Sequence, residues 1–143
     1  MSETITKAIT LEQPPEAVWQ ALTDSAALGE WLMPNDFEPR VGHRFTFRTE
    51  PNPKFNFDGI VHCEVRACAP PSELAYTWVG GGLDTLVTYR LIAADGGTRL
   101  ELEQSGFDTS QPLMQQVMKY ADYGWAGMLD QLAKVVAAVA PSR

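Results

Sequence analysis

Hydrophobic and polar positions alternate with a helical period in the last third of this chain and mostly with a period of two before it. Over residues 113–140 the apolar positions recur every three or four residues, as on one side of a helix. They form two adjacent rows, which contain Val117, Ala121, Gly124, Met128, Leu132, Val135 and Val139 in one and Met118, Trp125, Leu129, Ala133 and Val136 in the other. So broad an apolar face predicts one long helix lying on a flat hydrophobic surface.

Before residue 107 the period is mostly two, which is typical of strands. We predict six strands, at residues 4–12, 42–49, 55–67, 74–78, 85–93 and 98–104. Proline- and glycine-containing turns separate most of the later strands, and Asp95-Gly96-Gly97 is a strong hairpin signal. Connections this short favour antiparallel neighbours over parallel strands with crossover helices.

Two short helices are expected between the first and second strands. Pro14-Pro15 opens the first helix, since proline fits a first turn. Asp24 or Ser25 caps the second helix, which runs towards Trp31 and ends before Pro34. The order of strand, two helices, five strands and long helix predicts a single α+β domain over residues 1–143.

Aromatic residues gather on the predicted inner faces. This set comprises Trp31, Phe45, Phe47, Phe57, Tyr76, Trp78, Tyr89, Tyr120 and Trp125. Such residues suit a ligand cavity, which is mostly apolar with a few polar groups that fix orientation. They would equally suit a filled core, and we expect about half of them to line a cavity.

His43 is the candidate catalytic residue, because its parity places it on the same face as Phe45 and Phe47. There an imidazole could orient a ligand carbonyl or exchange a proton near neutral pH. The alternative is a histidine at the strand end, hydrogen-bonded to water. Gly124 and Gly127 also have two interpretations: close packing of the long helix on the sheet, or a widened cavity mouth.

Composition and charge narrow the function classes. A formal net charge of −7 argues against binding to nucleic acid or to an anionic membrane surface. The first residues show no targeting signal, so we expect a cytoplasmic protein. Cys63 and Cys68 are expected to be free thiols, and neither a metal site nor a cofactor is predicted, since no zinc or phosphate-binding motif is present.

A series of short motifs resembles a known family. They are Glu16 to Asp24 (EAVWQALTD), Glu30-Trp31-Leu32, Val41-Gly42, Gly59-Ile60-Val61, Leu74 to Trp78 (LAYTW), Gly97 to Leu100 (GTRL), Ser105-Gly106-Phe107, and Gly124-Trp125 with Leu129 and Leu132. In this order they are similar to the family named for the activator of heat-shock-protein-90 ATPase, which belongs to the START-like (SRPBCC, Bet v 1-like) helix-grip superfamily. Nearly the whole chain is covered.

The resemblance implies a curved antiparallel sheet that grips the C-terminal helix around an apolar cavity. It does not imply one activity, because this fold hosts lipid carriers, polyketide cyclases and hormone receptors. Some relatives form dimers, so a homodimer is possible. One departure is His43, which stands where the family usually has a second glycine after Val41-Gly42.

These observations lead to three hypotheses. The first, which we favour, is a cytoplasmic binding protein, rather than an enzyme, that holds an apolar or aromatic small molecule between the sheet and the long helix. The second is an enzyme of polyketide cyclase or hydrolase type that uses His43 with Tyr76 or Tyr89 in the same cavity. The third is a regulator of a chaperone ATPase, which the family name alone suggests.

Overall fold

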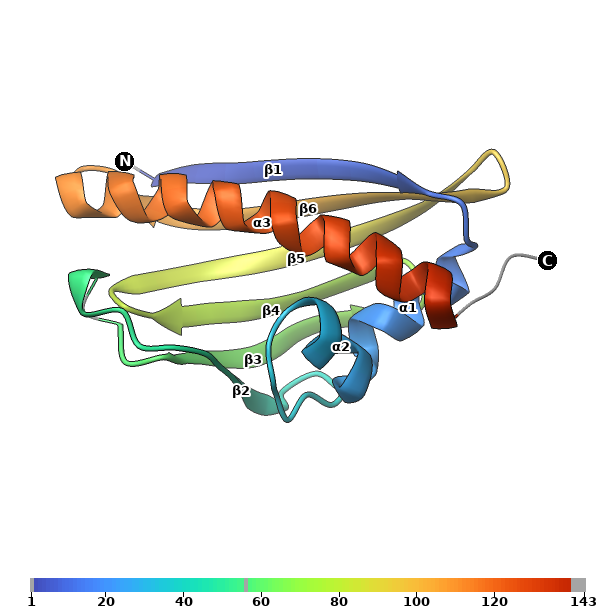
Figure 1. The fold of residues 1–143 in the computed structure, drawn as a ribbon, viewed down its shortest axis with the longest axis horizontal. Coiled ribbons are helices and arrows are strands. Elements are labelled where there is room, and N and C mark those ends of the chain that lie inside the picture. Colours follow the sequence, from blue (N-terminus) through green and yellow to red (C-terminus); the bar gives the residue numbers. More distant parts are fainter. Residues whose placement is uncertain (1, 56, 140–143) are drawn as a thin grey trace.

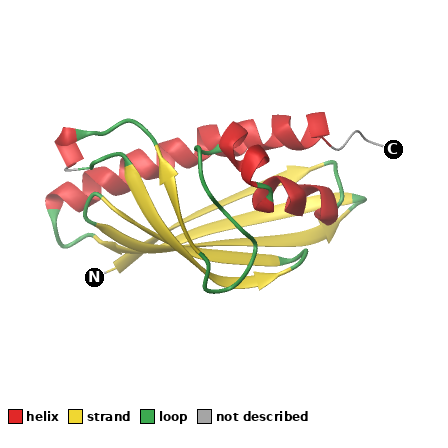
Figure 2. Ribbon diagram, turned by 90° about the horizontal axis from the view of Figure 1, so that it is seen from below, coloured by secondary structure: helices red, strands yellow, loops and turns green. Residues whose placement is uncertain are grey.

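The protein is a six-stranded antiparallel sheet with all three helices on one side of it (Figures 1 and 2). The computed structural model describes residues 2–55 and 57–139. The strands are β1 (Ser2–Leu11), β2 (Arg44–Arg48), β3 (Ile60–Ala69), β4 (Glu73–Gly80), β5 (Leu83–Ala94) and β6 (Gly97–Asp108), in the sheet order β1-β6-β5-β4-β3-β2. This arrangement confirms the predicted α+β helix-grip fold.

The two short helices, α1 (Pro15–Thr23) and α2 (Ser25–Trp31), cover one end of the sheet. Asp24 separates them, and its carboxylate caps α2 by accepting a hydrogen bond from the backbone N–H of Ala27 at 3.1 Å. The indole nitrogen of Trp31 donates to the carbonyl of Ala21 at 2.9 Å. This bond ties the end of α2 to α1 and holds both helices as one cover.

β3 begins later than predicted, at Ile60 rather than residue 55. A short 3₁₀ turn (Pro53–Phe55) and an isolated bridge between Asn52 and Phe57 precede it. The chain then turns at Gly59, whose φ of +87° an L-residue with a side chain rarely adopts. Phe57 therefore lies in a loop and not in the strand.

The long helix α3 (Pro112–Val139) crosses the sheet diagonally (Figure 1). Its predicted last residue, Ala140, lies outside the described residues. The helix packs against β1, β6, α1 and α2. Its buried side chains are Met114, Val117, Trp125, Leu129, Leu132, Val135 and Val136. An ion pair of 3.1 Å between Lys7 and Asp122 also joins it to β1.

A candidate ligand-binding cavity

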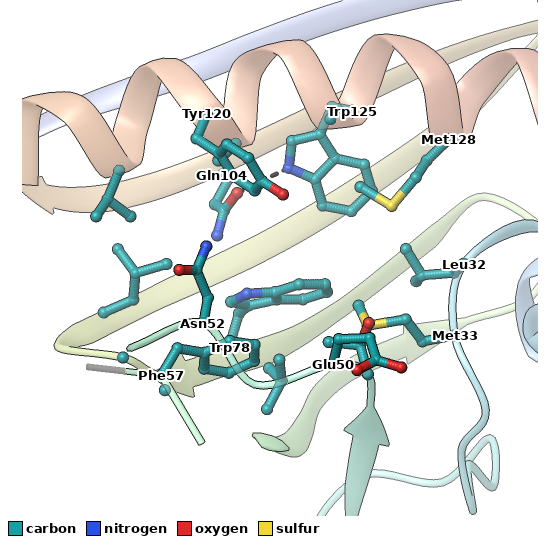
Figure 3. Close-up of a pocket in the computed structure, with 18 of the residues that line it drawn as sticks. Leu32, Met33, Glu50, Asn52, Phe57, Trp78, Gln104, Tyr120, Trp125 and Met128 are labelled. Carbon is teal, nitrogen blue, oxygen red and sulfur yellow. Dashed lines mark hydrogen bonds between the residues drawn. The ribbon is translucent and has the colours of Figure 1, made fainter. Parts of the chain in front are cut away.

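A cavity of about 580 Å³ lies between the middle of α3, the open end of the sheet and the loop that follows β2 (Figure 3). This volume is in the range of small-molecule sites. Most of its wall is apolar, from Leu32, Met33, Phe57, Val61, Trp78, Leu83, Val117, Ala121, Trp125 and Met128. The polar lining side chains are Thr49, Glu50, Asn52, Gln104 and Tyr120.

Two tryptophans from opposite layers approach each other in this wall. Trp78 rises from β4 and Trp125 descends from α3, and their ring centroids are 5.6 Å apart at an interplanar angle of 53°. Figure 3 shows both rings beside the open space. Flat aromatic walls of this kind provide a large contact area for a ligand with little side-chain freedom to lose.

A chain of buried hydrogen bonds connects the two tryptophans through the sheet. The indole nitrogen of Trp125 donates to Oε1 of Gln104 at 2.8 Å (Figure 3). Nε2 of Gln104 donates to Oγ1 of Thr85 at 2.9 Å, and that hydroxyl donates to the backbone carbonyl of Trp78 at 2.9 Å. This series of hydrogen bonds fixes α3 to β6, β5 and β4. It also places the amide of Gln104 at the cavity surface.

Four of the predicted aromatic residues line the cavity: Phe57, Trp78, Tyr120 and Trp125. The other five, Trp31, Phe45, Phe47, Tyr76 and Tyr89, are buried in the core and are not among the lining residues. Each of these five rings contacts at least one other ring of the set, and the centroids of the contacting pairs are 5.2–6.4 Å apart. The packed aromatic cluster and the cavity thus divide the concave face between them.

His43 is not among the cavity-lining residues. It lies just before β2, where its ring stacks on Phe45 with centroids 6.1 Å apart. Its Nε2 donates to the backbone carbonyl of Asp36 at 2.9 Å, since a carbonyl can only accept. The parity argument placed His43 beside Phe45 correctly, but the imidazole lies outside the cavity and its proton on Nε2 is engaged.

Tyr76 and Tyr89, the suggested helpers of His43, form a buried pair with their hydroxyl oxygens 2.6 Å apart. Burial raises the pKa of both phenols, so they remain protonated over the range in which acid–base catalysis near neutral pH takes place. Burial likewise raises the pKa of the nearby Cys63 thiol, and Asp36 adds to this rise. Both phenols therefore stay neutral near pH 7, and one of them accepts the hydrogen bond that the other donates.

Gln104 is a polar lining residue that the sequence interpretation missed. It is 1% exposed, which is uncommon for a polar side chain. A signal was present, because Gln104 has the same parity in β6 as the inward Leu100 and Leu102. Asn52, Met33 and Met128 were also missed, and these line the cavity from loops and from α3, where strand parity carries no information.

The two glycines of α3 do not mark close packing on the sheet. A Cβ atom at Gly124 would meet only the flexible Cε of Met128, at 3.9 Å, and one at Gly127 would meet nothing within 4 Å. Gly124 lines the cavity, whereas Gly127 faces solvent. The interpretation of Gly124 as a residue that widens the cavity is the one that fits.

The remaining candidate groups contribute no site. Cys63 and Cys68 are both free thiols, as expected. Within residues 2–55 and 57–139, no group of three or more His, Cys, Asp or Glu side chains could hold a metal ion. In the same ranges no helix has the length and apolar character needed to cross a membrane.

Comparison with solved structures places this geometry among known relatives. Protein MLL2253 from Mesorhizobium loti is 34% identical with a TM-score of 0.84, over 95% of this chain and 98% of that one. Protein BH1534 from Bacillus halodurans is 28% identical with a TM-score of 0.77, over 94% and 96%. The Aha1 dimer from Colwellia psychrerythraea, at 19% identity and a TM-score of 0.78 over 94% and 96%, shares the fold.

A search of curated proteins finds no match to the chain. A sequence model of the family described as "Activator of Hsp90 ATPase homolog 1-like protein" matches residues 12–137, which is most of the chain. The match includes both short helices, five of the six strands and nearly all of α3. The chain therefore belongs to the family of Activator of Hsp90 ATPase homolog 1-like proteins, within the START-like helix-grip superfamily.

Proposed function

We propose that this protein binds a hydrophobic or aromatic small molecule in the cavity between α3 and the sheet. The observation that carries the proposal is the cavity itself, about 580 Å³ with mainly apolar walls, two tryptophans and a buried amide. A few fixed polar groups in an apolar wall are typical of small-molecule sites. The lining is contributed by loops, strands and α3, so it exists only in the folded protein.

The experiment is a titration with a naphthalene derivative, followed by NMR of the indole N–H groups. Binding in the cavity should shift the Trp78 and Trp125 resonances and leave that of Trp19, which is not a lining residue, unchanged. A ligand at one hundred times its Kd should also stabilise the protein by about 2.7 kcal/mol. If saturating probe moves neither Trp78 nor Trp125, the proposal is wrong.

Two glycines of α3 offer a matched pair of variants. Gly124→Leu places a side chain in the cavity and should weaken probe binding by about tenfold or more, which corresponds to roughly 1.4 kcal/mol. Gly127→Leu adds the same side chain in open space three residues later and should leave binding unchanged. Equal affinity in both variants would show that the probe binds elsewhere.

The other sequence-based hypotheses remain predictions with their own tests. Catalysis by His43 would require turnover that His43→Ala abolishes, although the imidazole does not line the cavity. A role as chaperone regulator would require stimulation of the chaperone ATPase by excess protein. The homodimer is tested by light scattering after size-exclusion chromatography, and the cytoplasmic location by cell fractionation.

A further inference from the structure

We infer that the cavity selects ligands carrying a hydrogen-bond acceptor, such as a ketone or ester carbonyl on a flat aromatic framework, and that Gln104 is the residue that selects them. This inference rests on the proposed function, since it specifies the chemistry of the ligand for that cavity. It depends on the orientation of one buried amide and on the hydrogens that its partners leave available.

The neighbours of Gln104 allow its amide only one orientation. The Trp125 indole nitrogen is a donor without acceptor capacity, so the atom of Gln104 that faces it must be the oxygen. The nitrogen must then face Thr85. The Thr85 hydroxyl hydrogen is already donated to the carbonyl of Trp78, which leaves its oxygen to accept from Gln104. A flipped amide would bring two donors together at Trp125 and break both bonds.

This orientation leaves one amide hydrogen for the cavity. Nε2 carries two hydrogens, and the hydrogen bond to Thr85 uses one of them. The side chain is 1% exposed and lines the cavity, and Figure 3 shows its nitrogen on the side of the open space. Within the part of the chain that the structure describes, Nε2 has no second acceptor. A buried donor hydrogen without an acceptor is unfavourable, and a ligand acceptor would satisfy it.

Trp78 adds a second donor to the same wall. Its ring lines the cavity from β4, in the same sheet as Gln104, and Figure 3 shows both side chains beside the open space. The indole nitrogen of Trp78 makes no hydrogen bond to any of the described residues, although the ring packs on Trp125. At these two positions the wall offers N–H groups alone, which favour a ligand carbonyl over a methylene group; the other polar lining side chains, Thr49, Glu50, Asn52 and Tyr120, belong to other parts of the wall.

The test compares two probes of nearly equal shape, 1-acetylnaphthalene and 1-ethylnaphthalene, which differ by a carbonyl in place of a methylene. In the wild-type protein both should shift the Trp78 and Trp125 indole resonances, and only the acetyl probe should shift the side-chain NH₂ resonances of Gln104 downfield. The ratio of the two affinities should fall about tenfold when the donor is removed.

The donor is removed by Gln104→Glu, which keeps an acceptor for Trp125. Gln104→Glu should lose the preference for the acetyl probe at every pH from 6 to 9, because a neutral carboxyl has one hydrogen, which Thr85 accepts, and a carboxylate has none. Trp78→Phe removes the second N–H while retaining an aromatic ring, and it should reduce the preference by a smaller factor. Phe57→Leu, a lining residue without a polar group, should weaken both probes equally.

The outcomes separate this inference from the proposed function. If both probes shift the tryptophan resonances but the affinity ratio is the same in wild type, Gln104→Glu and Trp78→Phe, the inference is wrong and the binding function stands. If neither probe shifts Trp78 or Trp125, both are wrong. Should Gln104→Glu fail to fold, the wild-type NH₂ shifts and the Trp78→Phe ratio still decide.

Discussion

The hydroxyl groups of Tyr76 and Tyr89 lie 2.6 Å apart with neither side chain exposed to solvent. Burial raises the pKa of each phenol above its ordinary value. The folded state thus holds both protons at a pH at which an unfolded tyrosine, with a pKa of about 10, releases them. The pair therefore contributes stability that is present below pH 10 and is lost as the pH rises above it.

The first prediction follows from this pair. Urea denaturation at a series of pH values should show the free energy of unfolding falling steeply above about pH 10, and the Tyr76→Phe/Tyr89→Phe double variant should show a shallower fall. Tyr123→Phe is the control, since Tyr123 is 84% exposed. The interpretation fails if the double variant keeps the wild-type slope.

Truncation of Trp125 should destabilise the protein beyond the loss of ring area. Trp125→Phe leaves the buried Oε1 of Gln104 without its donor, which costs about 1–3 kcal/mol of unfolding free energy. Trp19→Phe is the comparison without a hydrogen bond to lose, because the Trp19 indole nitrogen bonds to none of the described residues; its ring is only partly buried, so it also loses less buried area. Urea midpoints measure the difference, and equal midpoints would contradict the assigned role of the Trp125–Gln104 bond.

Neighbouring glycines in the hairpin between β5 and β6 should respond differently to alanine. At Gly97 a Cβ atom would collide with the backbone carbonyl of Leu11, so Gly97→Ala has to separate β6 from β1. At Gly96 there is open space, and the cost is only that of a φ of +81°, about 1–2 kcal/mol. Thermal denaturation should therefore rank Gly97→Ala as clearly the less stable variant; the reverse order would refute the collision.

The two thiols should react with a disulfide reagent at very different rates. Cys63 is buried and burial raises the pKa of its thiol, so it should react only when the protein unfolds. Cys68 is partly exposed and should react in the native state. Cys68→Ser should consequently abolish the native-state reaction, measured by release of the coloured thiolate, whereas Cys63→Ser should leave it intact.

Strand parity was enough to predict which side chains face inwards. Phe45, Phe47, Tyr76 and Tyr89 are all buried, as the period of two in their strands requires. Parity could not predict which of them border open space, because that depends on where α1 and α2 cross the sheet. Those two helices cover one end of the concave face and α3 extends over the other, so Trp78 borders the cavity while Tyr76, two residues earlier, is enclosed in the core.

Periodicity could not predict the cavity residues that lie in irregular segments. Asn52 and Phe57 enter the cavity wall through a turn that an isolated bridge and the left-handed Gly59 define. His43 shows the opposite limit: its parity was interpreted correctly, yet its position just before β2 and its bond to the carbonyl of Asp36 hold the ring outside the cavity. The sequence pattern predicts which face of the sheet a side chain lies on. Its position along that face, in the core or at the cavity, depends on the tertiary arrangement.

The two ends of α3 have different surroundings. Leu132 and Val136, in its last turns, are fully enclosed, while Val117, Ala121 and Gly124 earlier in the helix border the cavity. The last turns of α3 therefore hold the helix on the sheet, Val117, Ala121 and Gly124 border the cavity, and Trp125 does both. If the proposed ligand binds here, exchange of Val117 or Ala121 should change which compounds fit while the enclosed Leu132 and Val136 keep the helix in place.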